Sequence, residues 1–273
     1  MEKGSDLLRQ VIVILSAGVA IVGSFIGSGA AGGTPIKDAA GGALGVDATL
    51  IAPGGAAFGI WTVIYIGLVA YAIWQSLPAQ REDPRQRLLG YPIAVSLVLN
   101  AAWIMSIQFD LLGLSVPVIV LLLADLAWAF LITLASRPKN IVDTIITDGT
   151  IGLYLGWVAI ATAANITAYL VAEGFDGFGL NTDGWAVVVL GVAGVVGVML
   201  AVVSRGRIAP AVALAWGLGW VAVARLTGNL LSTPAAITAI VAALAILAIT
   251  VSMRMRTKSR RPKTSSSPVS VNA

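Results

Sequence analysis

The chain contains eight apolar runs, each long enough to cross a lipid bilayer as a helix. Such a span needs about 20 mostly apolar residues. Inside hydrocarbon a single segment can hydrogen-bond all its backbone groups within itself only as a helix. With 58% of the 273 residues hydrophobic and 11% charged, little chain remains for a soluble catalytic domain. We therefore expect an all-α integral membrane protein with about eight transmembrane helices. The expected spans are residues 10–29, 54–77, 89–109, 114–136, 148–172, 185–204, 208–226 and 235–253.

Basic residues mark one side of these spans. If the N-terminus lies inside, only Lys37 and Arg225 fall on outer segments, and the positive-inside rule then predicts that both termini are cytoplasmic. Residues 254–273 are basic and then rich in Ser and Pro, so we expect a disordered tail that touches anionic lipid. Membrane lipid, and no nucleic acid, is the partner that this charge pattern favours. The inner basic residues are Lys3, Arg9, Arg81, Arg85, Arg87, Arg137, Lys139, Arg205, Arg207, Arg254, Arg256, Lys258, Arg260, Arg261 and Lys263.

Cysteine and histidine are both absent from the sequence. Their absence excludes disulfides, thiol chemistry, histidine-ligated metals and histidine proton relays. It also leaves ordinary acid–base catalysis with few candidate residues, so we expect no enzyme and no required cofactor. A haem-like tetrapyrrole, if bound, would have to be held as a ligand without a histidine bond.

Polar and aromatic residues interrupt four consecutive apolar runs. They recur at helical spacing, so each set lies on one face of its helix. Such stripes often serve packing between helices, but aromatic walls with a few polar groups also describe a pocket for a flat apolar ligand. The residues in these stripes are Phe58, Trp61 and Tyr65 in the second run, Asn100 and Trp103 in the third, Asp125 and Trp128 in the fourth, and Tyr154, Trp157, Ala161 and Asn165 in the fifth.

Asp125 is the most costly of these residues because it falls close to the centre of its span. A charged carboxylate there costs about 2.5–3.5 kcal/mol, so Asp125 should be protonated, paired or near water. It could contact a proton or a ligand, or it could hold helices together, with Asn100, Thr162 and Asn165 as candidate partners. Arg225, at the outer end of its span, is expected to extend its charged end toward the interface.

The composition changes near residue 174. Residues 1–173 hold most of the buried polar and aromatic residues, and residues 174–253 form a three-helix extension that ends at the 254–273 tail. In the sixth run, Ala193, Gly197 and Ala201 make a ridge of small residues suited to close helix contact, within the chain or in a homodimer. The Gly-rich outer connection 30–53 is either a lid over the aromatic runs or a floppy loop.

Four motifs resemble those of the TspO/MBR family, the tryptophan-rich sensory proteins and translocator proteins. The segment APGGAAFGIWTVIY (52–65) resembles the second-helix motif of that family, and LNAAW (99–103) resembles its third-helix motif. Asp125 resembles an acid in the fourth helix of many bacterial members. YLGWVAIATAAN (154–165) resembles the fifth-helix pattern, and the resemblance ends near residue 173.

The resemblance implies a five-helix bundle with an aromatic cavity beneath the loop between its first two helices, here followed by three extra helices. Family members bind porphyrins, which implies a receptor, sensor or carrier for a small flat apolar ligand in a bacterial cytoplasmic membrane. By matching positions, Trp61, Asn100, Trp157 and Ala161 would line the cavity, and Phe58, Tyr65, Trp103 and Asn165 would lie nearby.

Two other functions stay open on the sequence. A proton-coupled secondary transporter would use Asp125, with Arg225 as a partner, although no internal repeat of the kind common in transporters is evident. Photochemical or radical degradation of a bound porphyrin by the Trp residues is the remaining enzymatic alternative.

Overall fold

The computed structural model describes residues 2–259, and the described residues form helices without a strand. Eight of these helical segments are long and apolar enough to cross a membrane, which confirms the all-α membrane fold. The elements are α1 (Glu2–Gly27), η1 (Ala40–Gly42), η2 (Gly55–Gly59), α2 (Ile60–Ser76), α3 (Pro78–Arg81), α4 (Pro84–Gln108), α5 (Leu112–Ala135), α6 (Ile141–Asp143), η3 (Thr144–Gly149), α7 (Thr150–Ala172), η4 (Gly177–Gly179), α8 (Thr182–Val203), α9 (Ile208–Thr227) and α10 (Thr233–Ser259).

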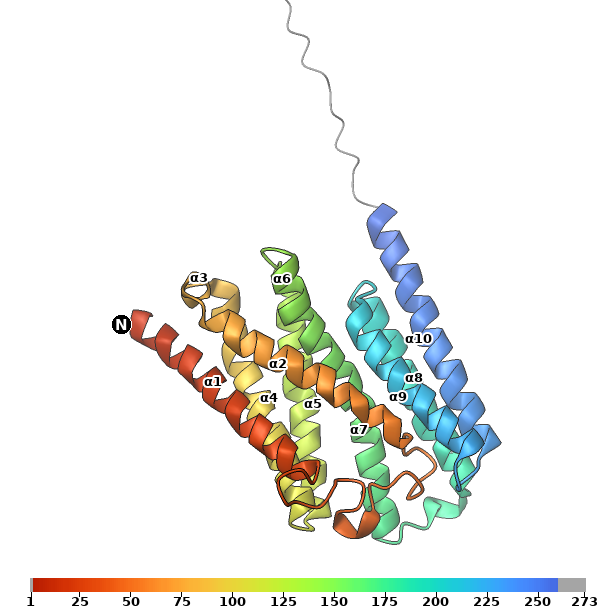
Figure 1. The fold of residues 1–273 in the computed structure, drawn as a ribbon. Coiled ribbons are helices and arrows are strands. Elements are labelled where there is room, and N and C mark those ends of the chain that lie inside the picture. The colour runs from red at the N-terminus through yellow and green to blue at the C-terminus, as the bar shows by residue number, and fades with distance from the viewer. Residues whose placement is uncertain (1, 260–273) are drawn as a thin grey trace, which may run out of the picture.

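The first five spans form a closed ring. Around the ring, α1 packs on α4, α4 on α5, α5 on α7, α7 on α2, and α2 on α1. Figure 1 shows α2 crossing diagonally from the side of α9 at one end of the bundle to the side of α1 at the other. We call the end that carries residues 28–54 the loop end and the opposite end the α6 end. The turn between α4 and α5 is short, as expected, so these two helices are antiparallel neighbours.

Small residues let α1 approach α4. A Cβ atom added at Gly23 would lie 3.4 Å from the Cβ of Ala101, and one at Gly27 would lie 2.8 Å from the Cγ2 of Ile104. An added methyl group would make ordinary contact at Gly23, whereas at Gly27 the Ile104 side chain would have to move.

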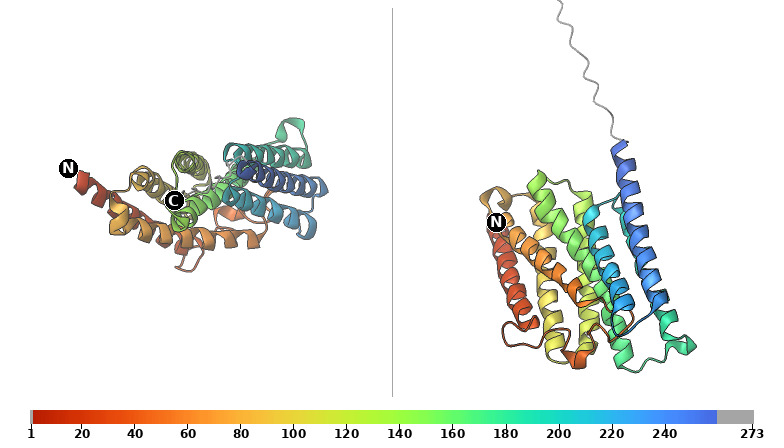
Figure 2. Two further views of the ribbon diagram at one scale, coloured as in Figure 1. Left: turned by 90° about the horizontal axis from the view of Figure 1, so that it is seen from above. Right: turned by 45° about the vertical axis from the view of Figure 1, so that its right-hand side comes forward.

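The remaining helices form a second group beside the ring (Figure 2). Helix α9 packs against α7, and α10 packs against both α8 and α9. Glycine makes the α7–α9 contact close, because a Cβ atom at Gly156 would overlap the carbonyl oxygen of Pro210. A Cβ atom at Gly217 would lie 2.5 Å from the Cγ2 of Ile160. The extension is therefore joined directly to the fifth span.

The ridge of small residues on α8 is used within the chain. A Cβ atom at Gly197 would overlap the side chain of Ile246 on α10 and would lie 2.7 Å from the Cδ2 of Leu214 on α9. Ala193 and Ala201 are buried on the same face. Of the two uses that the sequence allowed for this ridge, the structure shows packing inside the chain.

Buried charges tie the helices together at the α6 end. The Arg85 guanidinium pairs with Asp143 (Nη1–Oδ1, 2.7 Å) and with Asp148, and the other carboxylate oxygen of Asp148 lies 3.2 Å from Nη1 of Arg207. Arg207 also donates to the Thr133 hydroxyl of α5 at 2.8 Å. This cluster joins α4, α5, η3 and the start of α9, so it spans both the ring and the extension.

Asp83 caps the first turn of α4 just outside the span. Its carboxylate accepts a hydrogen bond from the Arg85 backbone N–H (2.8 Å) and pairs with Lys139 (2.7 Å). Burial on its own raises the pKa of Asp83, but these hydrogen bonds outweigh it and hold that pKa below its ordinary value.

Part of the segment expected to be a disordered tail belongs to α10. The helix continues to Ser259, so the first residues of the 254–273 segment are helical. Residues 260–273, which carry the rest of that expectation, lie outside the described residues.

Candidate functional site

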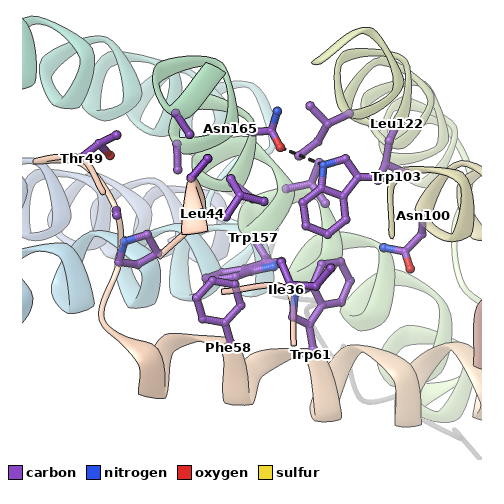
Figure 3. Close-up of a pocket in the computed structure, with 18 residues that line it drawn as sticks. Ile36, Leu44, Thr49, Phe58, Trp61, Asn100, Trp103, Leu122, Trp157 and Asn165 are labelled. Carbon is purple, nitrogen blue, oxygen red and sulfur yellow. Dashed lines mark hydrogen bonds between the residues drawn. The ribbon is translucent and has the colours of Figure 1, made fainter. Parts of the chain in front are cut away.

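A small cavity lies inside the ring at the loop end (Figure 3). Its volume is about 50 Å³, enough for only a few atoms. Ile36, Leu44 and Thr49 of the long loop line it from the loop end. The loop therefore covers the cavity, as expected of a lid. The residues expected at the site that line the cavity are Phe58, Trp61, Asn100, Trp103, Trp157, Ala161 and Asn165.

Aromatic rings form one wall of the cavity. The Trp157 ring meets Phe58 edge-on at 5.8 Å between centroids and meets Trp61 edge-on at 6.3 Å. Trp61 in turn stacks on Tyr65 at 5.4 Å. Edge-on and offset contacts of this kind are favourable, so the wall is preorganised and presents ring surface to whatever enters.

The cavity contains buried donors without acceptors. Trp157 is 1% exposed, and its indole Nε1–H has no hydrogen-bond partner among the described residues. Asn100 is equally buried; its Oδ1 accepts from the Tyr65 hydroxyl (2.6 Å), and its Nδ2 has no partner in the described part of the chain. Buried polar groups in proteins are normally paired, so these two donors need an explanation. A ligand with a hydrogen-bond acceptor supplies one.

Asn165 has a different role, although it lines the cavity. Its Oδ1 accepts from the Trp103 indole (2.9 Å), and its Nδ2 donates to the Ser115 hydroxyl (2.9 Å). These bonds join α7 to α4 and α5. The sequence left Asn165 open between ligand contact and helix packing; its amide is engaged in packing.

Three expected site residues lie outside the cavity wall. Tyr65 faces a neighbouring hollow, described below, and Tyr154 packs edge-on against Trp61 at 5.8 Å while its hydroxyl donates to the Ser96 carbonyl. Asp125 is half-buried and does not line the cavity. Asp125 lies on α5 beside the buried Leu122 and Leu126, outside the wall of this cavity, and its contact with a ligand stays a prediction.

None of the expected partners binds Asp125. The Asn100 Oδ1 and the Asn165 amide bond as described above, and the Thr162 hydroxyl donates to the Val158 carbonyl in its own helix. The Asp125 Oδ2 is buried without a partner among the described residues. A clasp between Asp125 and these residues is not what the structure shows.

The ring of five helices, the loop-covered aromatic cavity and the motif residues within it all agree with the family that the sequence resembles. A family model described as TSPO-like protein matches residues 11–252. This chain belongs to the TSPO-like family. The match continues through α8, α9 and most of α10, beyond residue 173 where the motif resemblance ended. No curated protein and no solved structure matches the chain.

A larger hollow adjoins the cavity of this TSPO-like protein. It has a volume of about 380 Å³ and lies between α1, α2 and the loop, with Ser24 and Phe25 on one side and Tyr65 on the other. Four residues line both the cavity and this hollow. The shared residues are Ile36, Phe58, Trp61 and Trp103.

Helix α9 contributes to the site in a way that was not predicted from the sequence. Trp216 donates through its indole N–H to the Ala57 carbonyl in η2 (2.9 Å), and Arg225 donates through Nη2 to the Val46 carbonyl in the loop (2.7 Å). Arg225 is 1% exposed, so the expectation that it extends to the interface was wrong: the loop folds over it. The pair of Trp residues four apart on α9 was the available signal, but their partners are backbone atoms far away in sequence.

Proposed function

We propose that this TSPO-like protein is a membrane receptor for a flat, largely apolar molecule that carries a hydrogen-bond acceptor, such as a porphyrin. Family membership supports a role of the receptor or sensor type. The observation that carries the more specific proposal is the buried indole N–H of Trp157, which has no partner in the part of the chain that the structure describes and belongs to an aromatic cavity wall. Rings would supply stacking surface, and Trp157 and Asn100 would donate to the acceptor.

Such a ligand requires the cavity to open. Pockets for small molecules usually measure about 300–1,000 Å³, far more than the present cavity. Movement of Ile36 and the Trp61 ring would merge the cavity with the adjoining hollow of about 380 Å³, which brings the space into that range. The proposed binding therefore includes displacement of the loop.

The transporter alternative receives less support. It needs Asp125 in the path of the substrate and Arg225 within reach of it. Asp125 lies outside the cavity wall, and Arg225 binds the loop instead.

The basic residues at the α6 end agree with our proposal that this end, together with both chain termini, faces the cytoplasm.

Titration with protoporphyrin IX tests the proposal. The metal-free porphyrin is the suitable probe because the chain has no histidine or cysteine to bind an iron. We expect Trp157→Phe, which keeps a ring but removes the indole N–H, to weaken binding about 3- to 10-fold, the usual loss for one hydrogen bond. The measurement is the change in porphyrin absorbance on titration with purified protein in detergent micelles.

Trp128→Phe is the matched control for this prediction. Trp128 is 58% exposed on α5, away from the cavity, so its replacement should leave the affinity unchanged. Equal affinities for the wild type, Trp157→Phe and Trp128→Phe, with the fold intact by circular dichroism, would reject the assigned site.

A further inference from the structure

Helix α9 holds the covering loop at two points and the adjoining η2 at a third. Starting from the middle of the helix, the Trp216 indole bonds to the Ala57 carbonyl, the Trp220 carbonyl accepts from the Gly54 N–H (3.1 Å), and Arg225 bonds to the Val46 carbonyl. Figure 1 shows the loop end of α9 next to the start of α2. The extension thus reaches the segment that covers the cavity.

The contact with Gly54 depends on the absence of a side chain. A Cβ atom at this position would lie 3.2 Å from the Cε3 of Trp220 and 3.4 Å from its carbonyl oxygen. Gly54 belongs to the APGG segment that begins the second-helix motif. In this chain the glycine lets the loop approach α9 closely.

Arg225 is the charged member of the set. It is fully buried at the loop end, and among the described residues its Nε and Nη1 have no hydrogen-bond partner. Asp47, which follows Val46 in the loop, accepts a hydrogen bond (2.9 Å) from the side chain of Asn229, just after α9. Two adjacent loop residues are therefore bound from α9 and the turn that follows it.

These bonds fix the part of the loop that matters for the cavity. Val46 and Asp47 lie between Leu44 and Thr49, which both line the cavity. Release of Val46 would free both lining residues together. The helix itself is anchored at its other end, where Arg207 binds Asp148 and Thr133, so the loop is the part free to move.

We propose that α9 is a latch for the loop over the cavity, and that Arg225 is the residue that positions the loop in its closed state. Among the described residues, the one hydrogen bond of the Arg225 side chain goes to the neutral backbone carbonyl of Val46, and the neighbouring Asp47 attracts the guanidinium through its charge. The extension of this TSPO-like chain would thereby set how readily the cavity opens. The inference rests on the cavity being the binding site, but not on the identity of its ligand.

The natural lack of cysteine allows a direct test without any ligand. Thr49→Cys places one thiol in the cavity wall, where the residue is 5% exposed. Its rate of labelling by N-ethylmaleimide in micelles measures how often the loop opens. We expect Arg225→Met, which keeps the aliphatic packing and removes the donors, to raise this rate about 10-fold or more, as befits the loss of a hydrogen bond from a charged group.

A second cysteine position separates loop opening from general loosening. Ser96 is 1% exposed in the middle of α4, away from the loop. The labelling of Ser96→Cys should therefore not change with Arg225→Met. Asn229 is exposed, so Asn229→Ala should fold normally and raise Thr49→Cys labelling by a smaller factor of about 2 to 3.

The labelling rates distinguish a latch from a general stabilising role of Arg225. Faster labelling at Thr49→Cys alone supports the latch. Unchanged labelling in both Arg225→Met and Asn229→Ala overturns it, and so does an equal rise at Ser96→Cys, which would make Arg225 a general stabiliser. Failure to bind protoporphyrin IX would reject the proposed ligand class and leave these rates unaffected.

Discussion

Arg85→Met should lower the free energy of unfolding by about 3–5 kcal/mol, the usual loss when one partner of a buried ion cluster is removed. Arg85 is nearly fully buried, and it pairs with both Asp143 and Asp148. Methionine fills similar space, but it leaves Asp148 with Arg207 and Asp143 with no ion pair among the described residues. The large effect comes from carboxylates left buried without compensation, more than from the net strength of the pairs.

The measurement is unfolding of the purified protein by sodium dodecyl sulfate in mixed micelles, followed by circular dichroism. Lys37→Ala is the control, since the Lys37–Asp38 pair is 59% and 53% exposed in its two side chains. Exposed pairs contribute about 0–1 kcal/mol, so this variant should unfold almost like the wild type. If Arg85→Met proves as stable as Lys37→Ala, water or another cation must reach the cluster, and the buried network described here is incorrect.

Gly156→Ala should destabilise the protein by about 1–3 kcal/mol, the range for overpacked interiors. The added methyl group would overlap the Pro210 carbonyl oxygen of α9 and lie 3.0 Å from the Cβ of Ala213. Backbone atoms on a packed helix cannot move aside as a side chain can, so α9 must shift away from α7. Because α9 holds the loop, the same variant should also open the cavity more often.

Gly191→Ala is the matched control for this change. Gly191 lies on α8 with no atom within 4 Å of an added Cβ, and alanine favours helix relative to glycine. The two variants are compared by the same detergent unfolding and by Thr49→Cys labelling. Equal stability of Gly156→Ala and Gly191→Ala would show that α7 and α9 do not pack closely, and that the extension is a separate unit.

The spans could be predicted because they depend on local composition. Each apolar run had to be a helix, since only a helix or a closed barrel pairs all its backbone groups inside a membrane. The ends of the helices were less predictable. The fifth span, for example, starts earlier than expected, with α6 and the π-helical segment Thr144–Gly149, because Asp143 and Asp148 are paired with Arg85. Those partners lie about 60 residues apart in the chain.

The cavity residues were predictable in part. Helical periodicity put Trp61 and Trp157 on definite faces of their helices, and the family motif indicated that these faces meet. Periodicity could not place Asp125, because a residue at the edge of a helical face belongs to the cavity or to the flank according to the rotation of that helix in the ring. Packing of Leu122 and Leu126 sets that rotation.

By itself, then, the sequence determined that this chain is an eight-helix membrane protein whose second to fifth spans carry aromatic and polar faces. These properties follow from hydrophobic length and helical period, which are local. Only the tertiary structure decided that the faces enclose a small covered cavity whose Trp157 and Asn100 donors have no partner among residues 2–259, and that α9 holds η2 through Trp216 and the cover through Trp220 and Arg225. Those contacts join residues more than 150 positions apart, and most of them engage backbone atoms, which leave no side-chain pattern in a sequence.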